Sequence, residues 1–243
     1  MPQPKRVFLS AEWRDLVMLN YEVEPSLLKS YVPPGAELDS FQGRTYVSLV
    51  GFRFCKTKLF GTLPIPFHAN FEEVNLRFYV RREVPGGEVR RGVVFISEIV
   101  PRFAIAATAR LVYGENYSSF PMRHRLETEG VNRTTEYQWR VANQWCKLKA
   151  KTTGYPAHPS EGSLEQFITE HYWGYSVQRK GGAVEYHVSH VPWQVWATTE
   201  ALFEGNASPL YGSELAAILQ RRPDCAFVAD GSLVEVFAGI RMQ

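Results

Sequence analysis

The chain has 243 residues, of which 45% are hydrophobic, 14% aromatic and 21% charged, and its 27 Lys and Arg against 25 Asp and Glu give a formal net charge of +2. This composition is typical of a globular protein, and the balanced charge without a basic cluster leads us to expect no nucleic-acid partner. No apolar run approaches the ~18 residues of a membrane span, and the first residues lack the apolar core of a signal peptide, so we expect a cytoplasmic protein without membrane contact. Cys55, Cys146 and Cys225 are scattered without metal-ligand spacing, which predicts reduced thiols.

Strand-like segments rich in β-branched and aromatic residues run through the whole chain. In chain order they are residues 15–23, 44–54, 71–83, 88–100 and 183–191. Turn sequences separate them, such as VPGGE at 84–88 and RKGGA at 179–183. The VPGGE turn predicts that residues 71–84 and 88–100 form an antiparallel hairpin.

Helical segments are fewer and shorter. They are expected at residues 24–32, 101–114, 162–173 and 212–224. Ser163 with Gln166 three residues later forms a capping-box pattern at the start of the third. The fourth is expected to begin at Ser213 and to stop before Pro223.

These elements predict one fold class for the whole chain. There is no internal repeat and no low-complexity linker, so we expect residues 1–243 to form a single domain. The mixture favours a β-rich α+β fold, a barrel with a few helices packed against it.

The segment FEEVNLRFYVRRE, residues 71–83, raises the first functional question. As a strand it places Glu73, Asn75 and Arg77 on one face, together with Phe71 and Tyr79. One interpretation is a solvated face with complementary charges, which is common in antiparallel sheets. The other is the wall of a partly enclosed site, which the aromatic neighbours favour.

Two further charged residues carry open alternatives. Glu98 follows the apolar run VVFIS and lies on the Val94/Ile96 parity, so it is either a buried carboxylate in need of a partner or a solvated residue after a strand that ends at Ser97. Arg110 is the only charged residue in AIAATARLV. It is either an exposed cation near a helix C-terminus or the buried partner of Glu73 or Glu98.

The remaining motifs point to ordinary structure. His171 and the other histidines have no metal-ligand spacing, so we expect neither a metal nor another cofactor. The alternation of Lys147, Lys149 and Lys151 with small or apolar residues predicts a half-buried strand with its lysines in water. The tryptophans of VPWQVW, residues 191–196, are expected in the core or in a pocket wall. P-loop, GxGxxG and GxSxG motifs are absent.

Several segments in the same order resemble the YqjF-like proteins, the DUF2071 family. They are residues 16–54, FEEVNLRFYV at 71–80, EQFITEHYWGY at 165–175 and VPWQVW at 191–196, and the resemblance covers most of the chain. That family is uncharacterised and is itself similar to acetoacetate decarboxylases. The resemblance therefore implies an antiparallel barrel-type sheet around a central, mostly apolar cavity.

The resemblance to acetoacetate decarboxylases fails at their reactive lysine. In that family Glu and Arg groups surround a lysine that forms a Schiff base with a β-keto acid, in a stretch of the form Gly-Arg-Glu-x-x-Gly-x-Pro-Lys-Lys. The comparable stretch here is ARLVYGENYS, residues 109–118, where Arg110 and Gly114 match but the lysine positions hold Tyr117 and Ser118. Glu73 matches an acidic pocket residue. We therefore expect no Schiff-base decarboxylation.

Three functions remain open from the sequence. The first is a non-catalytic protein that binds a small carboxylate or carbonyl compound in the cavity, with Arg77 or Arg110 on the anionic group and Asn75, Tyr79 and His171 as further contacts. The second is a lysine-independent enzyme. In it Glu73 or Glu98 would act as general acid or base, and Tyr117 would donate a hydrogen bond to an oxyanion. The third is an interaction scaffold whose cavity is filled by its own side chains. Whether the chain forms a homo-oligomer is left open.

Overall fold

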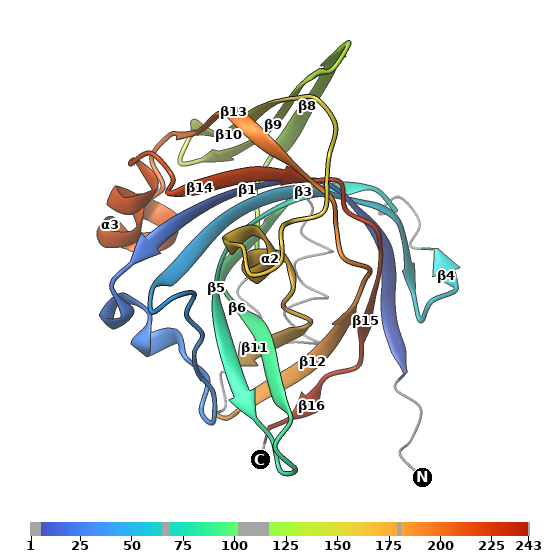
Figure 1. Ribbon diagram of the computed structural model, residues 1–243, viewed down its shortest axis with the longest axis vertical. Helices are drawn as coiled ribbons and strands as arrows, with labels where there is room; N and C mark the ends of the chain where they lie inside the picture. Colours follow the sequence, from blue (N-terminus) through green and yellow to red (C-terminus); the bar gives the residue numbers. More distant parts are fainter. Residues whose placement is uncertain (1–5, 65–68, 102–116, 179–180, 243) are drawn as a thin grey trace.

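The computed structural model describes residues 6–64, 69–101, 117–178 and 181–242, and strands dominate it (Figure 1). The strands are β1 Val7–Val23, β2 Glu37–Leu38, β3 Thr45–Leu59, β4 Leu63–Pro64, β5 Phe71–Glu83, β6 Val89–Val100, β7 Tyr117–Ser119, β8 Met122–Glu129, β9 Asn132–Val141, β10 Gln144–Thr153, β11 Trp173–Val177, β12 Ala183–Ser189, β13 Val195–Glu204, β14 Cys225–Ala229, β15 Leu233–Phe237 and β16 Ile240–Arg241. The helices are the 3-10 turns η1 Pro25–Leu27 and η2 Lys29–Tyr31, and the α-helices α2 Leu164–Thr169 and α3 Ser208–Leu219.

Seven strands close into a barrel. Their order is β3–β5–β6–β11–β12–β15–β1, and pairing of β1 with β3 closes the ring. All neighbours are antiparallel except β6 and β11. Closure leaves these strands without a free edge and encloses an interior, so side chains that alternate along each strand face either that interior or an outer layer.

The long strand β1 joins the barrel to a second sheet layer. Its first half pairs with β15, whereas residues 16–20 pair with β14, which continues through β13, β10 and β9 to β8. The change occurs beside a register irregularity at Asp15, whose φ of 57° breaks the regular strand. The Asp15 carboxylate lies 2.5 Å from both Arg53 and Arg133, which fixes the branch point.

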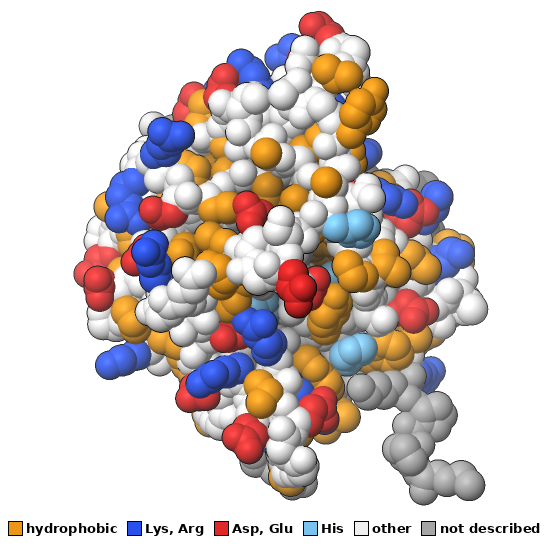
Figure 2. Space-filling view, viewed as in Figure 1, with side chains coloured by type: hydrophobic (Ala, Val, Ile, Leu, Met, Phe, Trp, Pro, Cys, Tyr) orange, Lys and Arg blue, Asp and Glu red, His pale blue; other side chains and the backbone are white. Residues whose placement is uncertain are grey.

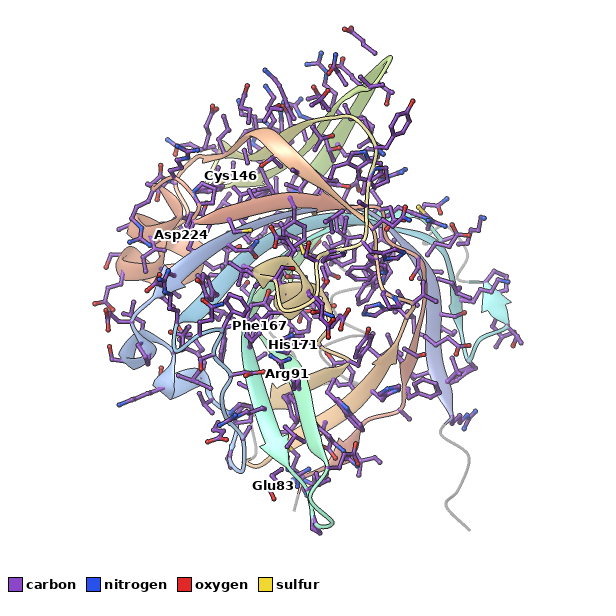
Figure 3. The ribbon with its side chains drawn as sticks, viewed as in Figure 1. Glu83, Arg91, Cys146, Phe167, His171 and Asp224 are labelled. Atoms are coloured by element: carbon purple, nitrogen blue, oxygen red, sulfur yellow. The ribbon has the colours of Figure 1, made fainter. Side chains whose placement is uncertain are left out.

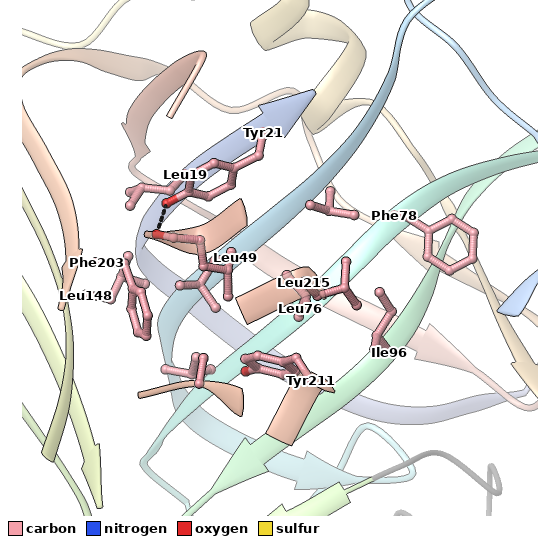
Figure 4. Packing of buried hydrophobic residues seen from close by; sticks show 14 of the residues in the cluster. Leu19, Tyr21, Leu49, Leu76, Phe78, Ile96, Leu148, Phe203, Tyr211 and Leu215 are labelled. Atoms are coloured by element: carbon pink, nitrogen blue, oxygen red, sulfur yellow. Dashed lines mark hydrogen bonds between the residues drawn. The ribbon is translucent and has the colours of Figure 1, made fainter. Parts of the chain in front are cut away.

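The apolar side chains form two separate cores. One lies between the barrel wall and the second layer, where residues such as Leu49 and Leu76 meet Phe203 of β13 and Leu215 of α3 (Figure 4). The other lies inside the barrel and includes Phe52. Burial of both faces explains why residues 45–52 of β3 are mostly apolar and all buried.

The predicted fold class is confirmed, and most elements lie where the sequence placed them. The β5–β6 hairpin is antiparallel, and Ser163 accepts the predicted capping bond from the backbone of Gln166 at 3.2 Å. Helix α3 begins at Ser208, earlier than expected, because Gly212 has φ 76° and joins two helical pieces across a kink. Residues 24–32 form two 3-10 turns instead of one helix. The helix expected at 101–114 lies outside the described residues apart from its first position.

The exposed charges and the three cysteines form no cluster that suggests a site within the described residues. Lys147, Lys149 and Lys151 are half-buried or exposed side chains of β10, opposite the buried Cys146 face, as predicted. All three cysteines are free. Charges of both signs are interspersed over the face seen in Figure 2. Among the described residues no helix is long and apolar enough to cross a membrane.

Candidate functional site

The interior of the barrel holds a cavity of about 280 Å³. Its wall is largely aromatic and aliphatic, with contributions from Phe52, Phe71 and Trp193 among others. Helix α2 lies in front of the barrel opening in Figure 1. Its residues Ile168 and Thr169 line the cavity at that end. Such an enclosed, mostly apolar space with a few polar groups is the usual form of a small-molecule site.

Strand β5 supplies the central polar side chains of this wall. Glu73, Asn75 and Arg77 all line the cavity and are only 3%, 2% and 7% exposed. The solvated-face interpretation of residues 71–83 is therefore wrong. The strand period of two places these groups inside, while Val74, Leu76 and the other alternate residues pack into the outer core.

Glu98 joins this face because of a β-bulge. The register of β5 against β6 shifts between Leu76 and Arg77, so that Ser97 and Phe95 face consecutive β5 residues and Ile96 is the extra residue. Glu98 thus lines the cavity together with Phe95. Its parity in the sequence implied the face of Val94 and Ile96, but these two residues pack into the outer core. Strand β6 continues to Val100 and Glu98 is 1% exposed, so the solvated alternative is also wrong.

Hydrogen bonds fix the carboxylate of Glu73. Asn75 Nδ2 donates to Glu73 Oε1 at 3.0 Å, and Tyr117 Oη donates to Glu73 Oε2 at 3.2 Å. Glu98 is paired through the backbone with Asn75 on one side and Tyr117 on the other. Two buried carboxylates, an amide and a phenol therefore form one acidic end of the cavity. The hydroxyl of Tyr117, which we expected to serve an oxyanion, donates here to a carboxylate.

Arg77 differs in its partners from the half-buried arginines Arg82 and Arg90. Arg82 and Arg90 both pair with Glu185, at 2.8 and 2.6 Å. Arg77 has no carboxylate partner within the described parts of the chain; its Nη2 makes one long bond of 3.5 Å to the carbonyl of Ile168. Its Nε is buried without a hydrogen-bond partner. A buried guanidinium without a partner lowers the stability of the fold unless an anion pairs with it.

His171 follows α2 and belongs to a buried polar chain. Its Nε2 lies 3.1 Å from Asp39 Oδ2, which also accepts from Arg91 Nε at 2.6 Å. Burial lowers the pKa of His171, and Asp39 opposes this only in part. Burial raises the pKa of Asp39, but hydrogen bonds from His171 and Arg91 outweigh it and leave that pKa below its usual value. A neutral imidazole therefore donates Nε2–H to an ionised carboxylate.

The ring of Phe167 covers this polar chain. Its centroid lies 4.9 Å from that of His171, and the Arg91 guanidinium lies 4.8 Å from the same ring (Figure 3). The ring of Tyr79 packs against both Phe167 and His171. Helix α2 is thus held over the barrel by aromatic contacts and by the hydrogen bond that His171, just after the helix, makes to Asp39.

Tyr79 packs its ring beneath α2, and its hydroxyl does not face the cavity. Its Oη lies 2.5 Å from Ser48 Oγ, which in turn donates to Asn20 Oδ1 at 2.5 Å. The phenol is therefore engaged inside the wall, and Tyr79 is not among the cavity-lining residues that the structure describes. Its ring lies 5.9 Å from the Arg77 guanidinium carbon.

Sequence reasoning gave little weight to His190 and none to Asp39. His190 lines the cavity and stacks on Trp193, with ring centroids 4.2 Å apart. The pocket-wall prediction for the tryptophans is confirmed by Trp193. No local motif marks either polar residue, because each depends on contacts with distant segments.

The expected Arg110 contact lies outside the described residues, as do positions 111–116 of the stretch compared with the decarboxylases. Tyr117 and Ser118 are described and form part of β7. No lysine is among the cavity-lining residues that are described, and residues 102–116 contain none in the sequence. Within the described ranges, no group of three metal-binding side chains comes together.

Comparison with known proteins agrees with this architecture. The model of the DUF2071 family, described as an uncharacterized conserved protein, matches residues 10–232. The uncharacterized protein YqjF of Bacillus subtilis is 24% identical over 183 residues, 74% of this chain and 72% of its own length.

Solved structures share the fold at low sequence identity. Acetoacetate decarboxylase from Legionella pneumophila has a TM-score of 0.63 and 15% identity, covering 100% of this chain and 92% of its own. The enduracididine biosynthesis enzyme MppR, solved with the condensation product of pyruvate and imidazole 4-carboxaldehyde, has a TM-score of 0.67 and 14% identity, covering 99% of this chain and 90% of its own. At these identities the likeness concerns the fold alone.

Proposed function

The chain belongs to the DUF2071 family of uncharacterized conserved proteins, and we propose that it binds a small organic carboxylate in its barrel cavity. In this proposal Arg77 holds the carboxylate group, and the apolar wall holds the rest of the molecule. The binding involves no Schiff base.

The state of Arg77 is the observation that carries the proposal. Arg77 is 7% exposed and lines the cavity, and its guanidinium has no acidic partner among the described residues. Guanidinium groups bind carboxylates in a planar, bidentate geometry. A ligand that supplies this anion would satisfy donors of Arg77 that the described residues leave without partners.

The size and chemistry of the cavity narrow the ligand. A volume of about 280 Å³ is just below the range of about 300–1,000 Å³ for ligand pockets, so a compact molecule fits best. Aromatic walls favour an apolar or weakly polar body. MppR, whose fold is similar, has been solved with pyruvate, a small carboxylate, and this precedent supports the same class here.

The lining argues against the decarboxylase mechanism. A Schiff base requires a desolvated amine, and the described lining contains no lysine. Buried carboxylates, an arginine and two histidines take its place. These groups can bind a carboxylate and exchange protons with it, but they cannot form an imine.

A thermal-shift series tests the proposal. Small acids of two to six carbons are compared with their uncharged amides on the wild type, on Arg77→Met and on Arg81→Met. Arg81 is the matched control, because it lies on β5 four residues further on but is exposed and pairs with Glu37. An acid at ten times its Kd stabilises by about 1.4 kcal/mol, which corresponds to about 3–6 °C in Tm.

The expected result is a shift with acids that amides do not give, lost in Arg77→Met and kept in Arg81→Met. Equal shifts in all three proteins would place the anion elsewhere. No shift with any acid, or equal shifts with acids and amides, would contradict the proposal.

A second candidate function is acid–base catalysis on the bound acid. It is favoured by Glu73 and Glu98, two carboxylates buried at one end of the cavity on neighbouring strands. Such a pair can divide the roles of acid and base. Exchange of a C–H hydrogen of the bound acid for deuterium in D2O, abolished in Glu73→Gln, would establish acid–base catalysis. Exchange no faster than in solvent would leave carboxylate binding as the only function supported. The scaffold function is disfavoured because the described side chains that line the barrel leave a cavity of about 280 Å³ between them.

A further inference from the structure

The imidazole of His190 is held rigidly at the cavity wall. It stacks on Trp193 with ring centroids 4.2 Å apart and planes within 17°. Tyr172 packs on it as well, with centroids 4.8 Å apart. Its Nδ1 lies 2.9 Å from the carbonyl oxygen of Val191. Three contacts from nearby segments therefore fix both the position and the rotation of the ring.

The contact with Val191 also fixes which nitrogen carries the hydrogen. A carbonyl oxygen only accepts, so Nδ1 must be the donor. The ring is neutral at physiological pH, because burial lowers the pKa of His190 to about 4, with a further lowering by the charge of Arg77. The remaining nitrogen, Nε2, is then a lone-pair acceptor. It has no hydrogen-bond partner among the described residues, and His190 lines the cavity.

His190 and Arg77 therefore act on the same space with complementary chemistry. Arg77 is close enough for its charge to affect the pKa of both His190 and His171. Arg77 offers only donors, whereas His190 Nε2 offers only an acceptor. His171 is committed differently, since its Nε2 bonds Asp39 and its Nδ1 is shielded. A small ligand that binds Arg77 thus meets His190 as the accessible imidazole.

We infer that the cavity selects carboxylates that also carry a hydroxyl group, with the carboxylate on Arg77 and the hydroxyl donating to His190 Nε2. This inference rests on the proposed carboxylate binding and adds the substrate class. A site with a fixed acceptor disfavours analogues that cannot donate, because the bound analogue then covers the acceptor without giving it a hydrogen bond. A keto group or a C–H in the position of the hydroxyl leaves His190 in that state.

Calorimetric titration of three acids of one chain length tests the inference. The probes are lactate, pyruvate and propionate, which differ only at C2, titrated into the wild type, His190→Phe, His190→Gln and the control His158→Phe. Phenylalanine keeps the stacking on Trp193 and Tyr172 but removes the acceptor, whereas glutamine restores an acceptor oxygen. His158 is exposed and lies outside the described cavity lining.

The wild type and His158→Phe should bind lactate about 10-fold more tightly than pyruvate or propionate. In His190→Phe the three affinities should converge through loss of lactate affinity alone, and His190→Gln should recover part of the preference. Equal affinities in the wild type, or a lactate preference that persists in His190→Phe, would overturn the inference while leaving carboxylate binding intact. If no acid binds the wild type, the proposed function fails as well.

Discussion

Replacing Arg77 with Met should make the protein more stable while it abolishes acid binding. Met has a similar length and no charge, so it keeps most of the packing of the Arg stem and removes the buried cation. Residues that serve a ligand are often held at a cost to the free energy of unfolding. Arg77 fits this description, because the partner proposed for its guanidinium is a bound ligand and not another residue of the chain.

The magnitude follows from the contacts of Arg77. A buried donor without a partner costs about 1–3 kcal/mol, and Nε of Arg77 is one. Against this, the variant loses one long hydrogen bond to Ile168 and a distant contact with the Tyr79 ring, together worth about 1 kcal/mol or less. The net expectation is a gain of about 1 kcal/mol in the free energy of unfolding, measured by urea denaturation without ligand.

Arg82→Met is the matched control, since Arg82 lies on the same strand and its side chain is 12% exposed. It pairs with Glu185, so its removal leaves a buried carboxylate with Arg90 alone and should cost about 1–3 kcal/mol. The two arginine substitutions should therefore shift stability in opposite directions. A loss of more than 1 kcal/mol in Arg77→Met, with an unchanged m-value, would refute the reasoning, because it would mean that the fold depends on this cation.

Three further substitutions test other parts of the account. Gly174→Ala should lower the free energy of unfolding by about 1–3 kcal/mol, because the added Cβ would lie 2.1 Å from the ring of Tyr186. The double variant with Tyr186→Leu should recover part of this loss. An unchanged urea midpoint in Gly174→Ala would contradict the close packing. Asp15→Asn keeps a residue that tolerates φ 57° but removes the charge that Arg53 and Arg133 share. The free energy of unfolding should fall by about 2 kcal/mol, and by less at high salt. A loss that does not change with salt would count against the ion pairs. His190 has a lowered pKa of about 4 in the folded protein, so protonation favours the unfolded chain and its contribution to stability, present above pH 6.5, is lost as the pH falls towards 4. Between pH 8 and pH 5 the wild type should therefore lose about 2 kcal/mol more than His190→Phe, and parallel pH profiles would argue against a buried neutral ring.

The strands and the cavity-facing side of β5 could be predicted because both depend on local alternation. Phe71, Glu73, Asn75 and Arg77 follow the period of two without interruption, and aromatic neighbours marked the face as enclosed. The capping box of α2 is equally local, since Ser163 and Gln166 lie within one turn. Signals of this kind survive in a single sequence.

The orientation of Glu98 could not be predicted, because one bulged residue at Ile96 inverts the alternation, and no residue type in VVFISEIV marks it. The roles of Asp39 and His190 were missed for a different reason. Asp39 meets His171 across 132 positions of sequence, and the tautomer of His190 depends on a backbone carbonyl. Partners that are set by tertiary contacts leave no local pattern.

The most direct test of carboxylate binding is a crystal structure of the protein soaked with a small bromine-bearing carboxylate, with the bromine located from its anomalous signal. If Arg77 binds the carboxylate, a bromine peak should lie inside the barrel, with the carboxylate oxygens about 2.7–2.9 Å from the Arg77 guanidinium. A cavity that stays empty at a saturating concentration, or a carboxylate bound away from Arg77, would contradict carboxylate binding by Arg77.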